Sequence, residues 1–175
     1  VIDLMKNNPR ICSYIDIPIQ HISDRMLRIM KRSHGGKATR DLLHRIRREL
    51  PGAAVRTTLI AGHPGETEKD YNELRDFISE FRFDRLGVFA YSHEEGTYSG
   101  EKYIDDVPET VKESRVSELM AIQQSISSDL NGQKTGRVLK VIIDRREGDY
   151  FIGRTEHDSP EVDNEVLIST KDELV

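Results

Sequence analysis

The residues best suited to ligand chemistry lie in a turn at residues 62–67, which reads Gly-His-Pro-Gly-Glu-Thr. An apolar, β-branched segment precedes the turn, and a helical pattern begins at Glu66. Backbone N–H groups in such a turn, together with the dipole of the following helix, can hold a polar or anionic ligand. An ordinary tight turn between a strand and a helix would contain the same residues. The turn alone therefore leaves both interpretations open.

Polar and aromatic residues also stand at the ends of two other apolar segments, residues 14–19 and 85–91. They are Gln20, His21 and Ser23 after the first segment, and Tyr91, Ser92 and His93 at the end of the second. The carboxyl ends of parallel strands meet at one edge of a sheet, where α/β proteins bind ligands. We therefore expect these residues to lie beside the turn at 62–67.

Arg56 and Thr58 alternate along a strand that is otherwise apolar, so they share one face of it. A buried arginine must be paired. Arg56 could therefore meet a carboxylate-bearing ligand in the interior of a barrel, or it could lie at an exposed edge or pair with a structural acid. We favour the interior position.

Four of the six histidines, His21, His34, His63 and His93, lie in or near predicted loops. Imidazole is a common metal ligand, but no pair of these histidines has ligand spacing on a single element. We therefore expect no protein-ligated metal, and we take His21 and His63 as candidates for contacts with a substrate.

The order of predicted elements indicates an α/β fold. Strands at residues 14–18, 55–61 and 85–91 alternate with helices that begin after the N-cap Ser23 and at residues 38–50, 66–81 and 108–130. This order favours a parallel sheet with right-handed crossover helices.

The periodicity changes from helical to alternating near Gln133. Strands are predicted at residues 138–144, 150–155 and 165–168, with a hairpin turn at 147–149. We therefore expect two domains, residues 1–132 and 133–175. The second would be a small antiparallel β module, and because three strands leave open edges it would be truncated.

Composition limits the function further. The formal net charge of −5 argues against a general nucleic-acid coat, and the single cysteine, Cys12, excludes an internal disulfide or an all-cysteine metal site. No apolar run approaches the length of a membrane span, and no signal-peptide pattern opens the chain. We expect a cytoplasmic protein, and one cut from a longer chain because it begins at Val1 in mid-pattern.

The chain resembles the methylthiotransferases of the radical S-adenosylmethionine superfamily. The resemblance rests on Tyr-Ile-Asp-Ile-Pro-Ile-Gln-His-Ile-Ser-Asp at residues 14–24, Arg-Thr-Thr-Leu-Ile-Ala-Gly at 56–62, Pro-Gly-Glu-Thr at 64–67 and Glu-Glu-Gly-Thr at 94–97. It implies that residues 1–132 are the C-terminal half of a partial TIM barrel. The module from Gln133 resembles the start of a TRAM domain, a small antiparallel β-barrel.

Two branches of this family compete. One modifies an isopentenylated adenosine beside the tRNA anticodon, and the other an aspartate of a ribosomal small-subunit protein. Gln-His-Ile-Ser at residues 20–23 and Arg-Thr-Thr at 56–58 resemble the ribosomal-protein branch. Acidic residues outnumber basic ones in the β module, which favours a basic ribosomal protein as partner over RNA. The acidic residues are Asp144, Glu147, Asp149, Glu156, Asp158, Glu161, Asp163 and Glu165.

The resemblance implies chemistry for which this sequence lacks the ligands. Family members use S-adenosylmethionine and two [4Fe-4S] clusters, one of them held by three closely spaced cysteines, and Cys12 matches no cluster position. We therefore expect no catalytic residue in the chain and no activity from the chain alone. Matching positions on the cofactor side are Gln20, Ser23, Arg56, Thr58, Gly62, Gly65, Glu66, Tyr91 and Ser92. A module that docks on RNA or the ribosome without chemistry remains the non-enzymatic alternative.

Overall fold

The protein is described by a computed structural model that covers residues 1–170 and residue 174. Its first part contains three parallel strands in the order β1 (Tyr14–Asp16), β2 (Ala54–Ala61) and β3 (Arg85–Ala90). Helices α2 (Asp24–Ile29) and α3 (Gly36–Glu49) follow β1, and α4 (Glu68–Phe81) follows β2. The parallel sheet predicted from the sequence is therefore confirmed.

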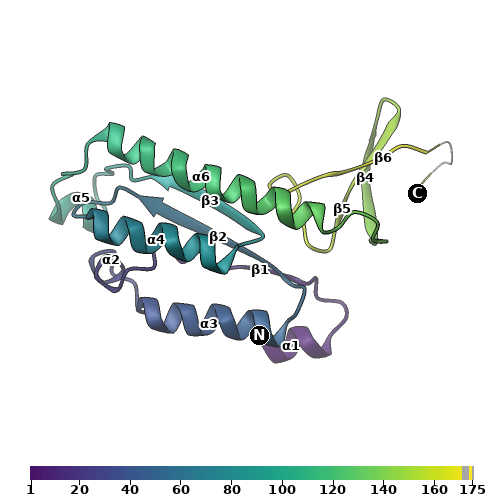
Figure 1. Cartoon of the computed structure of the whole chain (residues 1–175), viewed down its shortest axis with the longest axis horizontal. Coiled ribbons are helices and arrows are strands. Elements are labelled where there is room, and N and C mark those ends of the chain that lie inside the picture. The colour runs from purple at the N-terminus through teal and green to yellow at the C-terminus, as the bar shows by residue number, and fades with distance from the viewer. Residues whose placement is uncertain (171–173, 175) are drawn as a thin grey trace.

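One face of this sheet carries the core. Val55, Leu59 and Leu86 point from the strands into a cluster with Leu74 and Phe77 of α4. The long helix α6 (Glu109–Gly132) adds Leu119 and Ile126, and α3 adds Leu43 and Ile46. Figure 1 shows these helices running alongside the strands. The opposite face, which bears Arg56, Thr58 and Ile60, is only partly covered.

Several elements of the first part differ from the prediction, and α4, for example, begins at Glu68 rather than at Glu66. Helix α3 begins at Gly36, two residues earlier than expected, because the Asp24 carboxylate accepts a hydrogen bond from the Gly36 N–H at 2.7 Å. A side chain at Gly36 would lie 2.0 Å from the Ile22 carbonyl oxygen, so the close approach requires glycine. Residues 98–102, where no element is predicted from the sequence, form the short helix α5 (Tyr98–Lys102), which Thr97 caps.

The second part is a separate antiparallel sheet of β4 (Val141–Glu147), β5 (Tyr150–Thr155) and β6 (Val166–Ile168). The predicted hairpin is present, although β4 begins three residues later than the alternation indicated. A short helix, α1 (Ile2–Asn7), precedes β1. None of the helices in the described part of the protein has the length and apolarity to span a membrane.

The β module meets the first part at the N-terminal ends of the strands, beyond the C-terminal end of α6 (Figure 1). The Asp163 carboxylate accepts hydrogen bonds from Arg56 of β2 at 2.7 Å and from the Tyr14 hydroxyl of β1 at 2.8 Å. Asp158 forms an ion pair with Arg85 of β3. The two aspartates therefore join the module to all three strands.

This contact yields the first prediction. Replacing Asp163 by asparagine, in a double-mutant cycle with Arg56→Met, should give a coupling of about 0.5–3 kcal/mol in the free energy of unfolding. The reason is that the Asp163 side chain is 2% exposed, so water cannot replace the lost partner. Asp144, which pairs with Arg154 on the module's surface, is the control, and its pair should contribute less than about 1 kcal/mol. Equal couplings in both cycles, measured by urea unfolding, would contradict the prediction.

Tyr14 reports on the same contact. Burial and the hydrogen bond to Asp163 raise the pKa of Tyr14 to about 12. A phenol whose pKa is raised in the folded state contributes stability that is present below the unfolded pKa of about 10 and is lost as pH rises toward about 12. A tyrosinate absorbance titration, with Tyr14→Phe as the difference spectrum, should show this late transition. Asp163→Asn should move it to lower pH, and an unmoved transition would disprove the contact.

Candidate functional site

The turn at residues 62–67 lies at the C-terminal end of β2, and the N–H groups of both its glycines are bonded within the protein. Gly62 and Gly65 have φ angles of +74° and +77°, in the left-handed region that favours glycine. The Gly62 N–H donates to Glu66 Oε2 at 2.5 Å, and the Gly65 N–H donates to Asp106 Oδ1 at 2.7 Å. Carboxylates of the protein itself therefore occupy these two donors, so a ligand at the turn would have to use other groups.

Glu66 is the centre of a buried network. Its carboxylate side chain is 0% exposed and accepts from Gly62, from Arg115 of α6 at 2.7 Å and from His21 at 3.1 Å. The Ser23 N–H donates to His21 Nδ1 at 3.0 Å, so the proton of the neutral ring lies on Nε2 and points at Glu66. This network ties the loop after β1 to the turn after β2.

A second network begins at Ser23. Its hydroxyl caps α2 and donates to Asp70 Oδ1 at 2.6 Å, while Arg25 binds both Asp70 and the Gly65 carbonyl. Burial opposes ionisation of Asp70, but hydrogen bonds from Arg25, Ser23 and Thr67 outweigh it and lower the pKa of the carboxyl. Asp70 also completes the capping box of α4 with Thr67. Thus α2 and α4 are held together next to the turn.

The end of β3 contributes Tyr91, which is 8% exposed. The His63 ring contacts Tyr91 edge-on at 4.8 Å between centroids, and its two nitrogens bond the Pro64 carbonyl and the Ser99 hydroxyl. Burial lowers the pKa of His63 and so favours the neutral form of the ring. Lys112 of α6 lies over the Tyr91 ring, with its Nζ 5.4 Å from the centroid.

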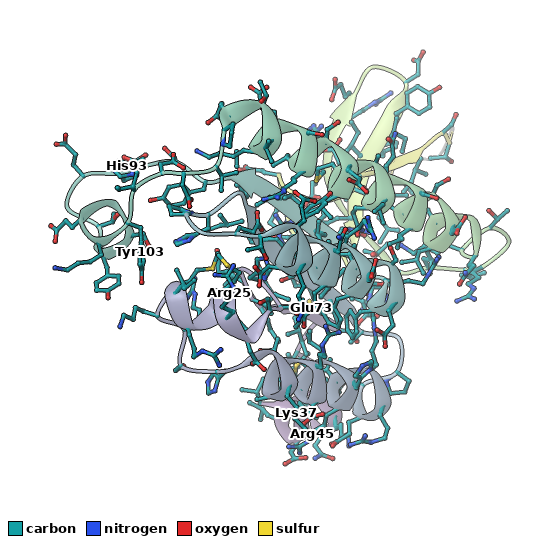
Figure 2. The ribbon with its side chains drawn as sticks, turned by 60° about the vertical axis from the view of Figure 1, so that its left-hand side comes forward. Arg25, Lys37, Arg45, Glu73, His93 and Tyr103 are labelled. Carbon is teal, nitrogen blue, oxygen red and sulfur yellow. The ribbon has the colours of Figure 1, made fainter. Side chains whose placement is uncertain are left out.

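The ends of the three strands therefore meet as predicted, but the side chains there differ in how accessible they are to a ligand. His21, Ser23, His63 and Glu66 are buried and bonded within the protein, so none offers a free polar atom to a ligand. The Ser92 hydroxyl is exposed and donates to Glu94. His93 projects with Tyr103 from the segment around α5 (Figure 2).

The open face of the sheet is the accessible part of the site. Thr58 and Ile60 are half-buried there, beside Gly87 and the 61% exposed Phe89 of β3. Gln20 lies alongside β2 with a φ of +67°, an uncommon angle for a residue with a side chain. Small and apolar groups therefore line the strip that leads to the turn.

Arg56 shares this face but is already paired. It binds Asp163 at 2.7 Å and approaches Asp16 at 3.6 Å. Of the three possibilities considered from the sequence, the structure therefore shows the pairing with a structural acid. No local pattern points to this partner, because Asp163 lies 107 residues further along the sequence.

Sequence reasoning also missed the residues that support the turn from behind. Lys112 and Arg115 lie on α6, and Asp105 and Asp106 precede it. The sequence did contain a signal for them, because Lys112 and Arg115 have the helical spacing of the buried face of α6 that also carries Leu119 and Ile126. A charged pair at core positions indicates buried partners.

A metal cluster does not fit the described residues. Within residues 1–170 and 174, no group of three or more histidine, cysteine, aspartate or glutamate side chains could hold a metal ion. Cys12 is exposed and precedes β1, at the opposite end of the sheet from the turn. Any cluster must therefore take its ligands from elsewhere.

Comparison with known families divides the sequence in two. Residues 1–78 match the radical SAM superfamily, and residues 135–175 match the TRAM domain. Coproporphyrinogen III oxidase (HemN) from Escherichia coli, a radical SAM enzyme, has a similar fold, with a TM-score of 0.59 and 15% identity over 89% of this chain and 43% of that one.

Curated relatives match over nearly the whole chain. The ribosomal protein uS12 methylthiotransferase RimO of Bacteroides thetaiotaomicron is 55% identical over 97% of the chain, and that of Cytophaga hutchinsonii is 55% identical over 100%. RimO of Flavobacterium johnsoniae is 53% identical over 100%. The chain spans only 39% to 40% of the length of these relatives.

Proposed function

Because this chain belongs to the RimO branch of the radical S-adenosylmethionine methylthiotransferases, we propose that it forms part of an enzyme that methylthiolates a ribosomal protein. The proposed reaction inserts a methylthio group at a C–H bond in the side chain of an aspartate of the small-subunit protein uS12. The observation that carries the proposal is the 55% identity, over the whole chain, to a relative named as a uS12 methylthiotransferase. A substrate of the ribosome would place the enzyme in the cytoplasm.

Residues 1–132 are proposed to be the C-terminal half of a partial TIM barrel, and residues 133–175 a TRAM module. The parallel sheet with helices on one face and one open face supports this, since the open face would line the interior of a barrel. The remaining strands, and the cysteines that hold two [4Fe-4S] clusters, would belong to the parts of the parent enzyme that this chain does not span. No catalytic step is therefore assigned to this chain.

S-adenosylmethionine is the ligand that fits the open face in this proposal. When bound, it would supply the radical chemistry of the reaction, together with a cluster held by parts of the parent enzyme outside this chain. Thr58 and Gln20 would contact it by hydrogen bonds, and the backbone of Tyr91 and Ser92 would meet its adenine. The exposed Phe89 beside half-buried Ile60 supports the assignment, because such a strip suits a flat, partly apolar group.

The buried residues of the site take supporting roles. Ser23, Gly62, Gly65 and Glu66 would hold the turn in shape rather than donate to the cofactor. His21 and His63 would act on the substrate only through the loops that they fix, because both nitrogens of each ring are already bonded. Arg56 would join the β module to the barrel.

The partner proposed for the β module is the basic uS12 protein. Five of the eight acidic residues named from the sequence are paired in the structure: Asp144, Glu147, Asp158, Asp163 and Glu165. Among the described residues, no ion pair engages Asp149, Glu156 or Glu161, which are exposed. These three carboxylates would supply the attraction.

A binding experiment tests the substrate class. The protein should bind uS12 more tightly than an isopentenylated anticodon stem-loop, and the triple change Asp149→Asn, Glu156→Gln, Glu161→Gln should weaken uS12 binding and its salt dependence. The control removes three charges elsewhere, by Asp41→Asn, Glu80→Gln and Glu113→Gln, and should leave binding unchanged. Preferential, salt-sensitive binding of the stem-loop would contradict the proposal.

A further inference from the structure

The segment at residues 105–115, which comprises part of the loop after α5 and the first turns of α6, contacts the turn at residues 62–67. It reaches both glycines of the turn by different means. Asp106 accepts from the Gly65 N–H at 2.7 Å, and Lys112 packs its aliphatic portion against Gly62. A Cβ at Gly62 would lie 2.3 Å from Lys112 Cγ, so no side chain larger than hydrogen fits there.

Lys112 is itself fixed by this segment. Its ammonium group binds Asp105 at 2.6 Å and Glu109 at 3.3 Å, although the side chain is only 3% exposed. The Tyr91 ring lies beneath it. The lysine side chain therefore fills the space between the end of β3 and the turn after β2, with its charge neutralised.

Arg115 acts one helical turn later. Its Nη1 donates to Glu66 Oε2 at 2.7 Å, and its Nη2 forms an ion pair with Glu68 at the start of α4. The guanidinium also lies 5.0 Å from the centroid of the Tyr71 ring. Because the same Glu66 oxygen accepts from the Gly62 N–H, Arg115 sets the orientation of that peptide through the carboxylate.

We infer that residues 105–115 are a brace that sets the shape of the turn at residues 62–67, at the end of the open face proposed to bind S-adenosylmethionine, with Arg115 and Asp106 as positioning residues for that binding. The inference rests on the proposed function for the identity of the ligand. The brace itself rests on the contacts above.

Amide hydrogen exchange of this protein, resolved by residue, tests the brace. Arg115→Met should speed exchange of the Gly62 N–H about tenfold or more relative to the amide of Leu59 in the core, because Glu66 loses its fixing charge. Asp106→Ala should speed exchange of the Gly65 N–H and leave Gly62 unchanged. Arg115→Lys should give an intermediate effect, since an ammonium can reach one carboxylate but not bridge two.

Arg82→Met is the matched control, because Arg82 forms an exposed ion pair with Asp129 away from the turn. It should change neither exchange rate. Unchanged Gly62 exchange in Arg115→Met would overturn the brace, and if that variant does not fold, Arg115→Lys and Asp106→Ala decide the same question.

Equilibrium dialysis of S-adenosylmethionine with the reconstituted parent enzyme tests the consequence. Arg115→Lys and Asp106→Ala should weaken binding about tenfold, with KM for the cofactor raised and kcat at saturation retained. Wild-type affinity in variants whose turn exchanges fast would overturn the inference. Failure of the wild-type parent to bind the cofactor would instead refute the proposed function, while the exchange rates would still decide the brace.

Discussion

Replacing Glu66 by glutamine is expected to reduce the free energy of unfolding by about 3 kcal/mol, at the lower end of the cost of breaking a buried ion pair. The carboxylate accepts from three donors, the Gly62 N–H, Arg115 and His21 Nε2, and its side chain is 0% exposed. Glutamine has one accepting oxygen and an NH₂ group, so at least one buried donor would face another donor. Urea unfolding of the two proteins measures the difference.

Glu73→Gln is the control for this change. Glu73 lies on α4 and also pairs with an arginine, Arg40, at 3.3 Å, but its side chain is 42% exposed. Its replacement should cost no more than about 1 kcal/mol. Similar costs at the two positions would show that the network around Glu66 does not stabilise the site as described.

Replacing Gly62 by alanine should destabilise the protein by at least about 2 kcal/mol and abolish cofactor binding by the parent enzyme. Two effects add here. The φ of +74° strains any residue with a Cβ, and the new methyl group would collide with the side chain of Lys112. Thermal or urea unfolding measures the first result and equilibrium dialysis the second.

Gly52→Ala separates the two causes. Gly52 has a φ of +90°, but a Cβ there would meet no atom within 4 Å. It should therefore show the backbone strain alone, about 1–2 kcal/mol, with cofactor binding intact. Lys112→Ala in the Gly62→Ala protein should recover part of the lost stability. If Gly62→Ala costs no more than Gly52→Ala, Lys112 does not confine the turn.

Local patterns were sufficient to predict the elements that position the site. The alternation at residues 54–61 and the helical spacing in α4 and α6 record which faces are buried, and glycine and proline mark the turn between them. Leu42 shows the limit of this method. Its helical spacing puts it beside Leu43 and Ile46 of α3, yet it is 43% exposed, because periodicity does not show how wide the packed face is.

The contacts that give the site its shape could not be predicted in the same way. Arg115 and Glu66 are 49 residues apart, and Arg56 and Asp163 are 107 apart, so no local pattern links them. A charged residue gives the same signal in the sequence whether its side chain is solvated or paired in the interior. The acidic surplus of the β module shows the same limit, since most of its named carboxylates are paired in the fold.

The position of the β module also bears on its proposed role. Helix α6 places Arg115 beside the turn and ends at Gly132, next to the module. At a rise of about 1.5 Å per residue, the two are separated by roughly 25 Å. In the proposed function, a uS12 molecule bound at the module would have to span this distance to present its aspartate, so the module would act as an anchor rather than as a part of the reacting site.

The most direct test is to present the reconstituted parent enzyme with both substrates. Purified ribosomal small subunits and isopentenylated tRNA would each be incubated with S-adenosylmethionine, a reductant and a sulfur source, and analysed by mass spectrometry of uS12 peptides and of tRNA nucleosides. A methylthio group on an aspartate of uS12, with none on tRNA, is the result expected. Modification of the tRNA adenosine, or an unmodified uS12 with active clusters, would contradict the proposed function.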